Sequence, residues 1–203
     1  MQKFSELLCQ NPIILAVKNE EDFAAALESK AKVIFMLFGT LSDISRYVQS
    51  AKDHHKLIFI HFDLIDGLAP HEAGVDFLME NTLADGIIST RPKLLSYAKE
   101  CGFITIMRMF QLDSLSLETL ERNFNQCQPD FIECLPAVFT RNFRKYKKLL
   151  NCDVIAGGLI SSQQDIKQAL VDGAIAVSTS KLSFTELIGS RAIARSADLY
   201  SVS

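Results

Sequence analysis

Eight short apolar runs, separated by segments with helical spacing, constrain the fold of this chain more than any other feature. The runs are rich in Ile, Val and Phe and are apolar on both faces, which is typical of parallel strands with helices outside and side chains packed inside. They span residues 13–17, 33–38, 57–62, 86–89, 103–107, 131–135, 154–156 and 174–177. The segments between them place apolar residues at intervals of three and four, over 21–27, 41–52, 71–83, 92–101, 117–124, 140–150 and 163–171. A strand and then a helix, repeated, predicts a parallel α/β fold.

Eight such repeats favour a single-domain (β/α)8 TIM-like barrel over an open doubly wound sheet, since no GxGxxG fingerprint follows the first run. At 203 residues the chain is near the lower limit of about 200 for such a barrel, so insertions must be few. Ser42-Asp43 near a helix start, Pro92 in a first turn and Asp172-Gly173 at a helix end agree with these boundaries. We expect the barrel core over residues 1–182, and an eighth helix and a tail over 183–203, part of the same domain or partly disordered.

Charge and cysteine usage exclude several classes of protein. The net charge of −3 argues against general affinity for nucleic acid or anionic lipid, so any such partner needs a local patch. The five cysteines are widely spread without a CxxC pair, which disfavours a zinc site or a disulfide framework. An acidic residue lies where a signal peptide needs its apolar run, and no apolar stretch approaches the ~18 residues of a membrane span. We therefore expect a cytoplasmic protein with no membrane partner.

Two strand ends near the C-terminus resemble a phosphate-binding cup. The run 154–156 is followed by Gly157-Gly158, and the run 174–177 by Ser178-Thr179-Ser180. Residues with small side chains let backbone N–H groups of two neighbouring loops converge on an anion. The loops after strands 7 and 8 form such a site in many (β/α)8 barrels, although paired glycines also occur in plain tight turns. This pattern predicts a ligand that carries a phosphate.

Polar residues also follow other strands, at the barrel end where chemistry takes place. They are Lys18, Asp63, Arg108 and Glu133. Alternation along the strands puts Lys18 on the face of Ile14 and Ala16, so both Lys18 and Arg108 are expected to face the barrel mouth. The alternative is that these charged side chains form ion pairs with one another and have only a structural role at the barrel rim, as Lys18 with Asp63 or Arg108 with Glu133. His61, on an apolar strand, is more often a hydrogen-bonded core residue than a functional one.

The expected helix after strand 6 carries several cations and no acid. Arg141, Arg144, Lys145 and Lys148 follow one another at helical spacing and would share one face. Such a face is usually just solvated. In an acidic chain it is also a candidate contact for a polyanion such as RNA.

Six sequence runs, in order along the chain, go beyond general barrel features. They are 61–68 (HFDLIDGL), 85–90 (DGIIST), 108–114 (RMFQLDS), 129–136 (PDFIECLP), 156–160 (AGGLI) and 177–180 (VSTS). Together they resemble the glycerol-3-phosphate responsive antiterminator family (GlpP) over about residues 11 to 182. The family's usual Leu-Pro-Gly after strand 6 is here Leu135-Pro136-Ala137, which questions the conformation of that loop, and the tail beyond Lys181 does not match.

The resemblance implies a TIM-barrel-like regulator that binds glycerol-3-phosphate and acts on the messenger RNA leader of glycerol-utilisation genes, preventing premature termination of transcription. It implies a regulatory protein rather than an enzyme, with no cofactor and no metal, and leaves self-association open. By position, the phosphate-binding residues would be Gly157, Gly158, Ser178 and Thr179. By the same ring geometry, Lys18, Asp63, Arg108 and Glu133 would address the glycerol hydroxyls or the phosphate edge.

Two alternatives from other classes stay open at this point. A small phosphate-binding barrel can be a lyase, an isomerase or a glycerophosphodiester hydrolase acting on a triose or glycerol phosphate. Asp63 and Glu133 would then exchange a proton, Lys18 or Arg108 would stabilise an enolate, and a metal could lie between the two carboxylates. The other alternative is a degenerate barrel kept as a protein-binding scaffold, against which the polar mouth argues.

Overall fold

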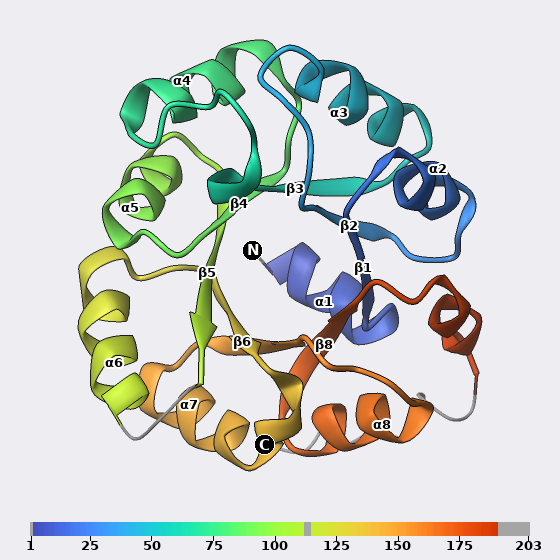
Figure 1. Ribbon diagram of the computed structural model, residues 1–203. Helices are drawn as coiled ribbons and strands as arrows, with labels where there is room; N and C mark the ends of the chain where they lie inside the picture. Colours follow the sequence, from blue (N-terminus) through green and yellow to red (C-terminus); the bar gives the residue numbers. More distant parts are fainter. Residues whose placement is uncertain (1, 112–114, 191–203) are drawn as a thin grey trace.

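The computed structural model describes residues 2–111 and 115–190, and these form the predicted closed barrel of eight parallel strands (Figure 1). The strands pair in chain order, and β8 pairs with β1 to close the ring. They are β1 (Ile13–Val17), β2 (Val33–Met36), β3 (Leu57–His61), β4 (Gly86–Ser89), β5 (Ile104–Phe110), β6 (Phe131–Leu135), β7 (Asp153–Gly157) and β8 (Ala174–Thr179). All eight predicted strands are present, so the fold prediction is confirmed.

Helices surround the barrel and alternate with its strands, as Figure 1 shows. They are α2 (Glu20–Glu28), α3 (Ile44–Asp53), α4 (Glu72–Asn81), α5 (Pro92–Glu100), α6 (Leu115–Cys127), α7 (Phe143–Leu150) and α8 (Gln163–Val171). Local sequence explains several of their ends. Ser162 begins α8 with a capping box to Asp165, and Pro92 occupies the first turn of α5. Gly173 follows α8 at φ +108°, a conformation that favours glycine.

Apolar residues form one layer between strands and helices and a second layer inside the barrel. The inner layer includes Ile14, Ala16, Phe35, Phe59 and Ile106. The predicted alternation on strands 1 and 5 is therefore confirmed, because Ile14, Ala16 and Ile106 face inward. The same alternation brings the next inward positions, at the ends of the strands, to the barrel mouth.

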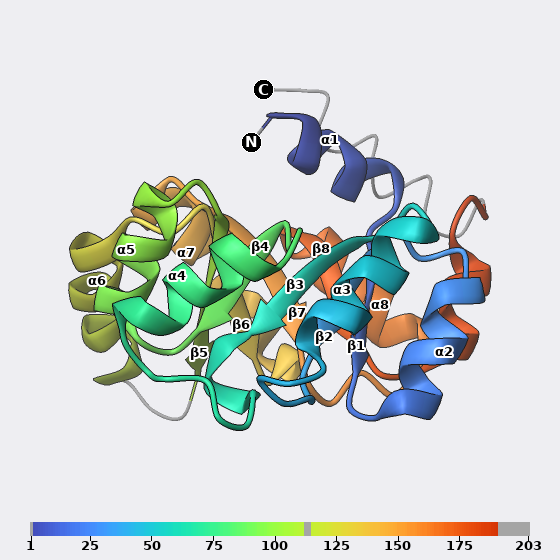
Figure 2. The same ribbon diagram turned by 90° about the horizontal axis from the view of Figure 1, so that it is seen from above.

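An N-terminal helix that we did not predict, α1 (Gln2–Gln10), covers the opposite end of the barrel (Figure 2). Phe4 and Leu8 of this helix are buried with the inner apolar layer. The Phe4 ring stacks on Phe59 with centroids 5.0 Å apart and meets Phe131 edge-on at 5.2 Å. The helix therefore closes the barrel end that lies away from the predicted phosphate-binding loops.

Three 3-10 helices change the predicted loop structure: η1 (Phe62–Leu64), η2 (Ala137–Asn142) and η3 (Leu182–Leu187). The predicted helix over 140–150 is split, because η2 ends at Asn142 and α7 begins at Phe143. At the predicted eighth helix the described part, to residue 190, forms η3, while 191–203 lie outside the described residues. The division at residue 182 stays a prediction. Within the described ranges, no helix has both the length and the apolar character that crossing a bilayer requires.

Candidate functional site

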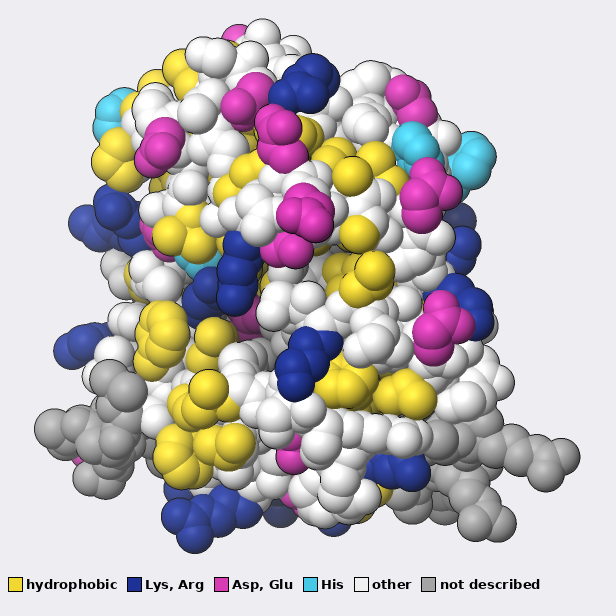
Figure 3. Space-filling model, turned by 45° about the vertical axis from the view of Figure 1, so that its right-hand side comes forward, with side chains coloured by type: hydrophobic (Ala, Val, Ile, Leu, Met, Phe, Trp, Pro, Cys, Tyr) yellow, Lys and Arg dark blue, Asp and Glu magenta, His cyan; other side chains and the backbone are white. Residues whose placement is uncertain are grey.

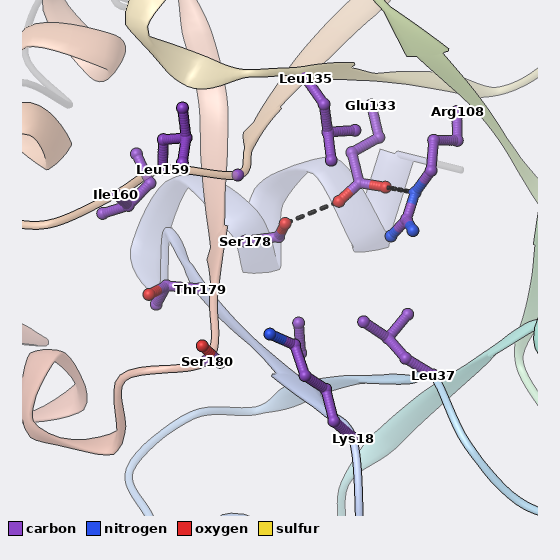
Figure 4. Close-up of a pocket in the computed structure, with 12 residues that line it drawn as sticks. Lys18, Leu37, Arg108, Glu133, Leu135, Leu159, Ile160, Ser178, Thr179 and Ser180 are labelled. Carbon is purple, nitrogen blue, oxygen red and sulfur yellow. Dashed lines mark hydrogen bonds and ion pairs between the residues drawn. The ribbon is translucent and has the colours of Figure 1, made fainter.

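A cavity of about 250 Å³ lies at the barrel mouth, where the carboxyl ends of β1, β2 and β5 to β8 meet (Figure 4). It is lined by Ala16, Lys18, Leu37, Arg108, Glu133, Leu135, Gly158, Leu159, Ile160, Ser178, Thr179 and Ser180. Figure 3 shows the molecule hollowed on this face, with Lys and Arg side chains at the edge of the hollow. Six of the eight predicted ligand residues line this cavity, while their binding roles stay predictions.

The carboxylate of Glu133 organises the floor of the cavity. It is completely buried and accepts hydrogen bonds from Arg108 Nε at 2.7 Å and from the Ser178 hydroxyl at 2.6 Å (Figure 4). The Ser178 hydroxyl proton is thus committed to Glu133, although its oxygen can still accept a hydrogen bond. The buried ion pair is favourable only because Ser178 satisfies the second carboxylate oxygen. The pairing of Arg108 with Glu133, left open by the sequence, is present.

Gly157 lies behind this network and does not line the cavity. A Cβ atom at Gly157 would lie 2.8 Å from Glu133 Oε1 and 2.9 Å from Ser178 Oγ. These distances are shorter than any ordinary contact, so only glycine lets the carboxylate and the hydroxyl meet against β7. Its geometry gives Gly157 a packing role, whereas the sequence predicted direct contact with phosphate.

Gly158 and Leu159 form a left-handed turn at the cavity wall. Their φ angles are +72° and +57°, and both residues line the cavity. Successive residues in such a turn bring backbone N–H groups together in an anion-binding concavity. The carbonyl of Gly158 accepts a hydrogen bond from Ala137 N at 3.1 Å, which ties this turn to η2. The backbone of the turn after β7 is therefore fixed at the cavity wall.

Lys18 supplies the cation on the opposite wall. Its side chain extends from the end of β1 into the space beside Ser178 and Ser180 (Figure 4). Among the residues that the structure describes, no ion pair or hydrogen bond engages its ammonium group. The rival pairing of Lys18 with Asp63 is absent between these two described residues. A cation therefore faces the two loops that the sequence assigned to a phosphate.

Asp63 lies outside the cavity, in η1. Its carboxylate accepts hydrogen bonds from the Ser89 hydroxyl and from Thr90 N at 2.8 Å, and it pairs with Arg91 Nε at 3.0 Å. These contacts fix the loop after β4. The carboxylates of Asp63 and Glu133 thus serve different partners, and the described part of the chain contains no group of three or more side chains that could hold a metal ion.

His61 is buried inside the barrel at the end of β3, and its Nδ1 atom has no hydrogen-bond partner within the described ranges. Burial, together with the nearby positive charge of Arg108, lowers the pKa of its imidazole from 6.5 to about 4, against a smaller opposing effect of Asp63. The imidazole is therefore neutral at physiological pH. The expectation of a fully hydrogen-bonded core histidine does not hold for Nδ1.

Comparison with known proteins identifies the family. The model of the glycerol-3-phosphate responsive antiterminators matches residues 13–184. This chain belongs to that family. It is 37% identical over 173 residues to the uncharacterized protein YgcP of Escherichia coli K12, covering 85% of this chain and 91% of that protein.

Solved structures agree with this antiterminator assignment. A glycerol uptake operon antiterminator regulatory protein from Listeria monocytogenes is 34% identical with a TM-score of 0.80, over 83% of this chain and 91% of that one. A glycerol uptake operon antiterminator-related protein from Thermotoga maritima is 26% identical with a TM-score of 0.77, over 87% and 98% of the two chains. Aldolases and orotidine 5'-phosphate decarboxylases that are 11–17% identical share the fold alone.

The antiterminator family's Leu-Pro-Gly, here Leu135-Pro136-Ala137, requires no special backbone at its third position. Ala137 is buried and begins η2, and it is not among the residues with positive φ. The N–H group that it donates to Gly158 would be present for either residue. Alanine therefore preserves the contact between the loops after β6 and β7.

The four predicted RNA-contacting cations are all exposed. Arg141 lies in η2, two residues after the kink at Phe139, and Asn142 and Phe143 continue with right-handed helical backbone into α7. Arg144, on α7, donates to the carbonyl of Val171 at the end of α8 at 2.6 Å. Lys145 and Lys148 remain exposed on α7. An RNA contact by these four residues stays a prediction.

Proposed function

We propose that this antiterminator family member binds glycerol-3-phosphate in the mouth cavity, and that the ligand-bound protein binds the leader of a messenger RNA and prevents termination of transcription. Family membership supports both parts of this proposal. The cavity supplies the physical basis of the first part. A location of the protein in the cytoplasm, where transcription takes place, follows from this proposed function.

One observation carries the ligand assignment: the Lys18 ammonium, which has no partner among the described residues, faces the backbone turns after β7 and β8 across a cavity of about 250 Å³. Converging N–H groups and a cation are the features that bind a phosphate. The volume is below the range of roughly 300–1,000 Å³ for drug-sized ligands, which suits a small molecule. The phosphate would lie against Gly158 and Ser178 to Ser180, with Lys18 opposite.

The glycerol hydroxyls would then face the floor of the cavity. There the Ser178 oxygen, the Glu133 carboxylate and the Arg108 guanidinium provide acceptors and donors in one layer. Hydroxyl groups need both, since each can donate one hydrogen bond and accept others. Asp63 is left out of this assignment because its carboxylate is engaged with Ser89, Thr90 and Arg91.

A binding protein fits this floor better than an enzyme. Both oxygens of Glu133 already accept hydrogen bonds, from Arg108 and from Ser178, so proton transfer would have to break a buried ion pair. His61 carries a neutral imidazole but does not line the cavity. Asp63 lies outside it. The proposed exchange of a proton by Asp63 and Glu133, on which the lyase, isomerase and hydrolase alternatives rest, is therefore not supported by this geometry.

A ligand can favour the RNA-binding state only if it binds that state more tightly, and RNA must then raise ligand affinity by the same factor. A thermal-shift panel of glycerol-3-phosphate, glycerol, inorganic phosphate and dihydroxyacetone phosphate tests the ligand. Glycerol-3-phosphate should raise the melting temperature most. Calorimetric titration of glycerol-3-phosphate, with and without leader RNA, tests the coupling. Equal ligand affinity in both titrations would contradict the coupling. Turnover of glycerol-3-phosphate would contradict a role in binding alone.

A further inference from the structure

Four large apolar side chains are exposed beside the mouth. We call this group of side chains the rim patch; it consists of Phe110 (50% exposed), Val138 (56%), Phe139 (42%) and Leu159 (70%). Figure 3 shows hydrophobic side chains gathered at the lower left of the hollow, with Lys and Arg side chains below them. A soluble protein hides such a group unless the surface has a use.

Backbone hydrogen bonds hold the three segments of the rim patch together. Phe110 pairs with Leu135 in register across β5 and β6, and Gln111 N donates to the Leu135 carbonyl at 2.7 Å. Ala137 N donates to Gly158 O at 3.1 Å. The end of β5, η2 and the turn after β7 are thus consecutive along the rim, and each contributes exposed apolar side chains to it.

Leu159 shows that the rim patch is maintained at a cost in stability. Its φ of +57° lies in the left-handed region, where a residue with a Cβ loses about 1–2 kcal/mol. Glycine or asparagine would avoid most of this cost in such a turn. The exposed leucine side chain gains little from burial to offset it. Because strained residues of this kind gather at binding sites, and Leu159 also lines the cavity, it belongs to both surfaces.

The charges next to the rim patch favour an anionic partner. Arg141 follows Phe139 by two residues in η2, and exposed Lys145 and Lys148 continue along α7. From residue 137 to 150 the sequence contains no Asp or Glu. A symmetric contact between two copies through this surface would bring two such basic stretches close together. Exposed aromatic rings beside cations are instead the pattern that binds unpaired nucleotides, through base stacking and phosphate contacts.

We propose that the rim patch is a base-stacking site for single-stranded RNA, with Phe110 and Phe139 as the stacking rings and Leu159 as its border with the ligand cavity. The inference deepens the proposed function, on which its RNA partner rests. Gln111 supports the arrangement, since it accepts hydrogen bonds from the Tyr146 hydroxyl and from Asn142 Nδ2, both at 3.2 Å. These hydrogen bonds connect the end of β5, which carries Phe110, to η2 and α7, which carry Phe139 and the basic residues.

The test compares RNA binding by the full-length protein and by the variant Phe110→Leu/Phe139→Leu, which keeps apolar bulk but removes both rings. The probe is labelled oligo(A) of about 12 nucleotides, measured by fluorescence anisotropy in the presence of glycerol-3-phosphate, with an RNA duplex of equal length as comparison. We expect the variant to bind oligo(A) about tenfold more weakly, or worse, and the duplex to bind weakly to both proteins. Leu83→Ala removes another exposed side chain, between α4 and β4, and should leave RNA binding unchanged.

The outcomes separate this inference from the ligand proposal. A thermal shift with glycerol-3-phosphate that both proteins share, together with weaker oligo(A) binding by the ring variant alone, supports the rim patch. A missing ligand shift with ring-dependent RNA binding would remove only the ligand assignment. Unchanged oligo(A) affinity in the ring variant, or no binding by the unmodified protein, would overturn the inference. Loss of a dimer in sedimentation without loss of RNA binding would make the rim patch a self-association surface instead.

Discussion

Arg108 donates through Nε to a Glu133 carboxylate that is completely buried at the floor of the mouth cavity, across 2.7 Å. The pair is fixed from a third side by the Ser178 hydroxyl. Burying two charges is costly unless they pair and their remaining hydrogen-bonding capacity is met, and this arrangement meets both conditions. Neighbouring strands β5 and β6 place the two residues opposite each other in register. The three side chains that stabilise this floor are therefore also those that we propose as ligand contacts.

Glu133→Gln should lower the free energy of unfolding by about 3 kcal/mol, because it leaves the Arg108 charge buried without its counter-charge. Urea denaturation measures the change. Glu80→Gln, at an exposed position on α4, removes the same charge at the surface and should stay within about 0.5 kcal/mol of the unmodified protein. Equal stability of the two variants would show that the buried pair contributes no more than a surface charge.

Gly157→Ala should lower both stability and glycerol-3-phosphate affinity, because its Cβ would enter the space of Glu133 Oε1 and Ser178 Oγ. Overpacking of this kind costs roughly 1–3 kcal/mol. Gly102→Ala is a useful comparison, since its Cβ meets no atom within 4 Å and only its positive φ opposes the change. It should be mildly destabilising and leave ligand affinity intact. Retained ligand affinity in Gly157→Ala would show that the network does not shape the cavity.

The pH dependence of stability should include a contribution from His61. Its pKa is about 4 in the folded protein and 6.5 in the unfolded chain, so the unfolded state binds the proton more tightly. The contribution of neutral His61 to the free energy of unfolding is thus present above pH 6.5 and is lost as the pH drops toward 4. Between pH 6.5 and 5 the loss should be roughly 1.6 kcal/mol.

The variant His61→Gln should flatten this part of the pH profile, measured by urea denaturation at several pH values. His71→Gln, at an exposed position before α4, should leave the profile unchanged. A profile that keeps its full slope in His61→Gln would mean that another group is responsible. Such a result would also remove the link between the interior histidine and the charge of Arg108.

The cations of α7 should contribute to the salt dependence of RNA binding. Each phosphate contact with single-stranded RNA adds about 0.7 to the slope of log affinity against log salt concentration. Lys145→Gln/Lys148→Gln should therefore reduce this slope by about 1.4 in a filter-binding titration over several salt concentrations. These two positions are preferable to Arg144, whose bond to Val171 O also supports α8.

Lys3→Gln/Lys32→Gln provides the matched control for charge. Both lysines are exposed, and both lie at the barrel end covered by α1, away from the mouth. The control should keep the full slope. If both double variants lower the slope equally, RNA is attracted by general charge, and α7 has no special role.

Local sequence patterns were sufficient to predict the strands, their parallel order and the inward positions of Lys18 and Arg108. All of these follow from periodicity and from the closure of eight repeats, which needs no distant information. The helix α1 was missed because it packs across the barrel end, where Phe4 contacts Phe59 and Phe131. Apolar residues at positions 4 and 8 were the signal that could have revealed it.

The site was harder to predict where a loop changes the direction of a side chain. Asp63 follows β3 directly, but η1 turns its carboxylate toward Ser89 and Thr90. Gly157 looked like part of an anion-binding turn, whereas its neighbours Glu133 and Ser178 explain it by close packing. Such distinctions depend on contacts between strands that are far apart in sequence. The rim patch, which spans the end of β5, η2 and the turn after β7, was not recognised in the sequence for the same reason.

The most direct test of the account is a calorimetric titration of glycerol-3-phosphate into three proteins: the unmodified chain, Lys18→Gln and Lys3→Gln. Lys18 faces the cavity, whereas Lys3 lies on α1 at the opposite end, so the two variants lose the same charge in different places. A hydrogen bond to a charged group is worth about 1.5–3 kcal/mol, which predicts roughly 10- to 100-fold weaker binding by Lys18→Gln and unchanged binding by Lys3→Gln. Equal affinities in all three proteins, or no binding by the unmodified chain, would contradict a phosphate-binding mouth.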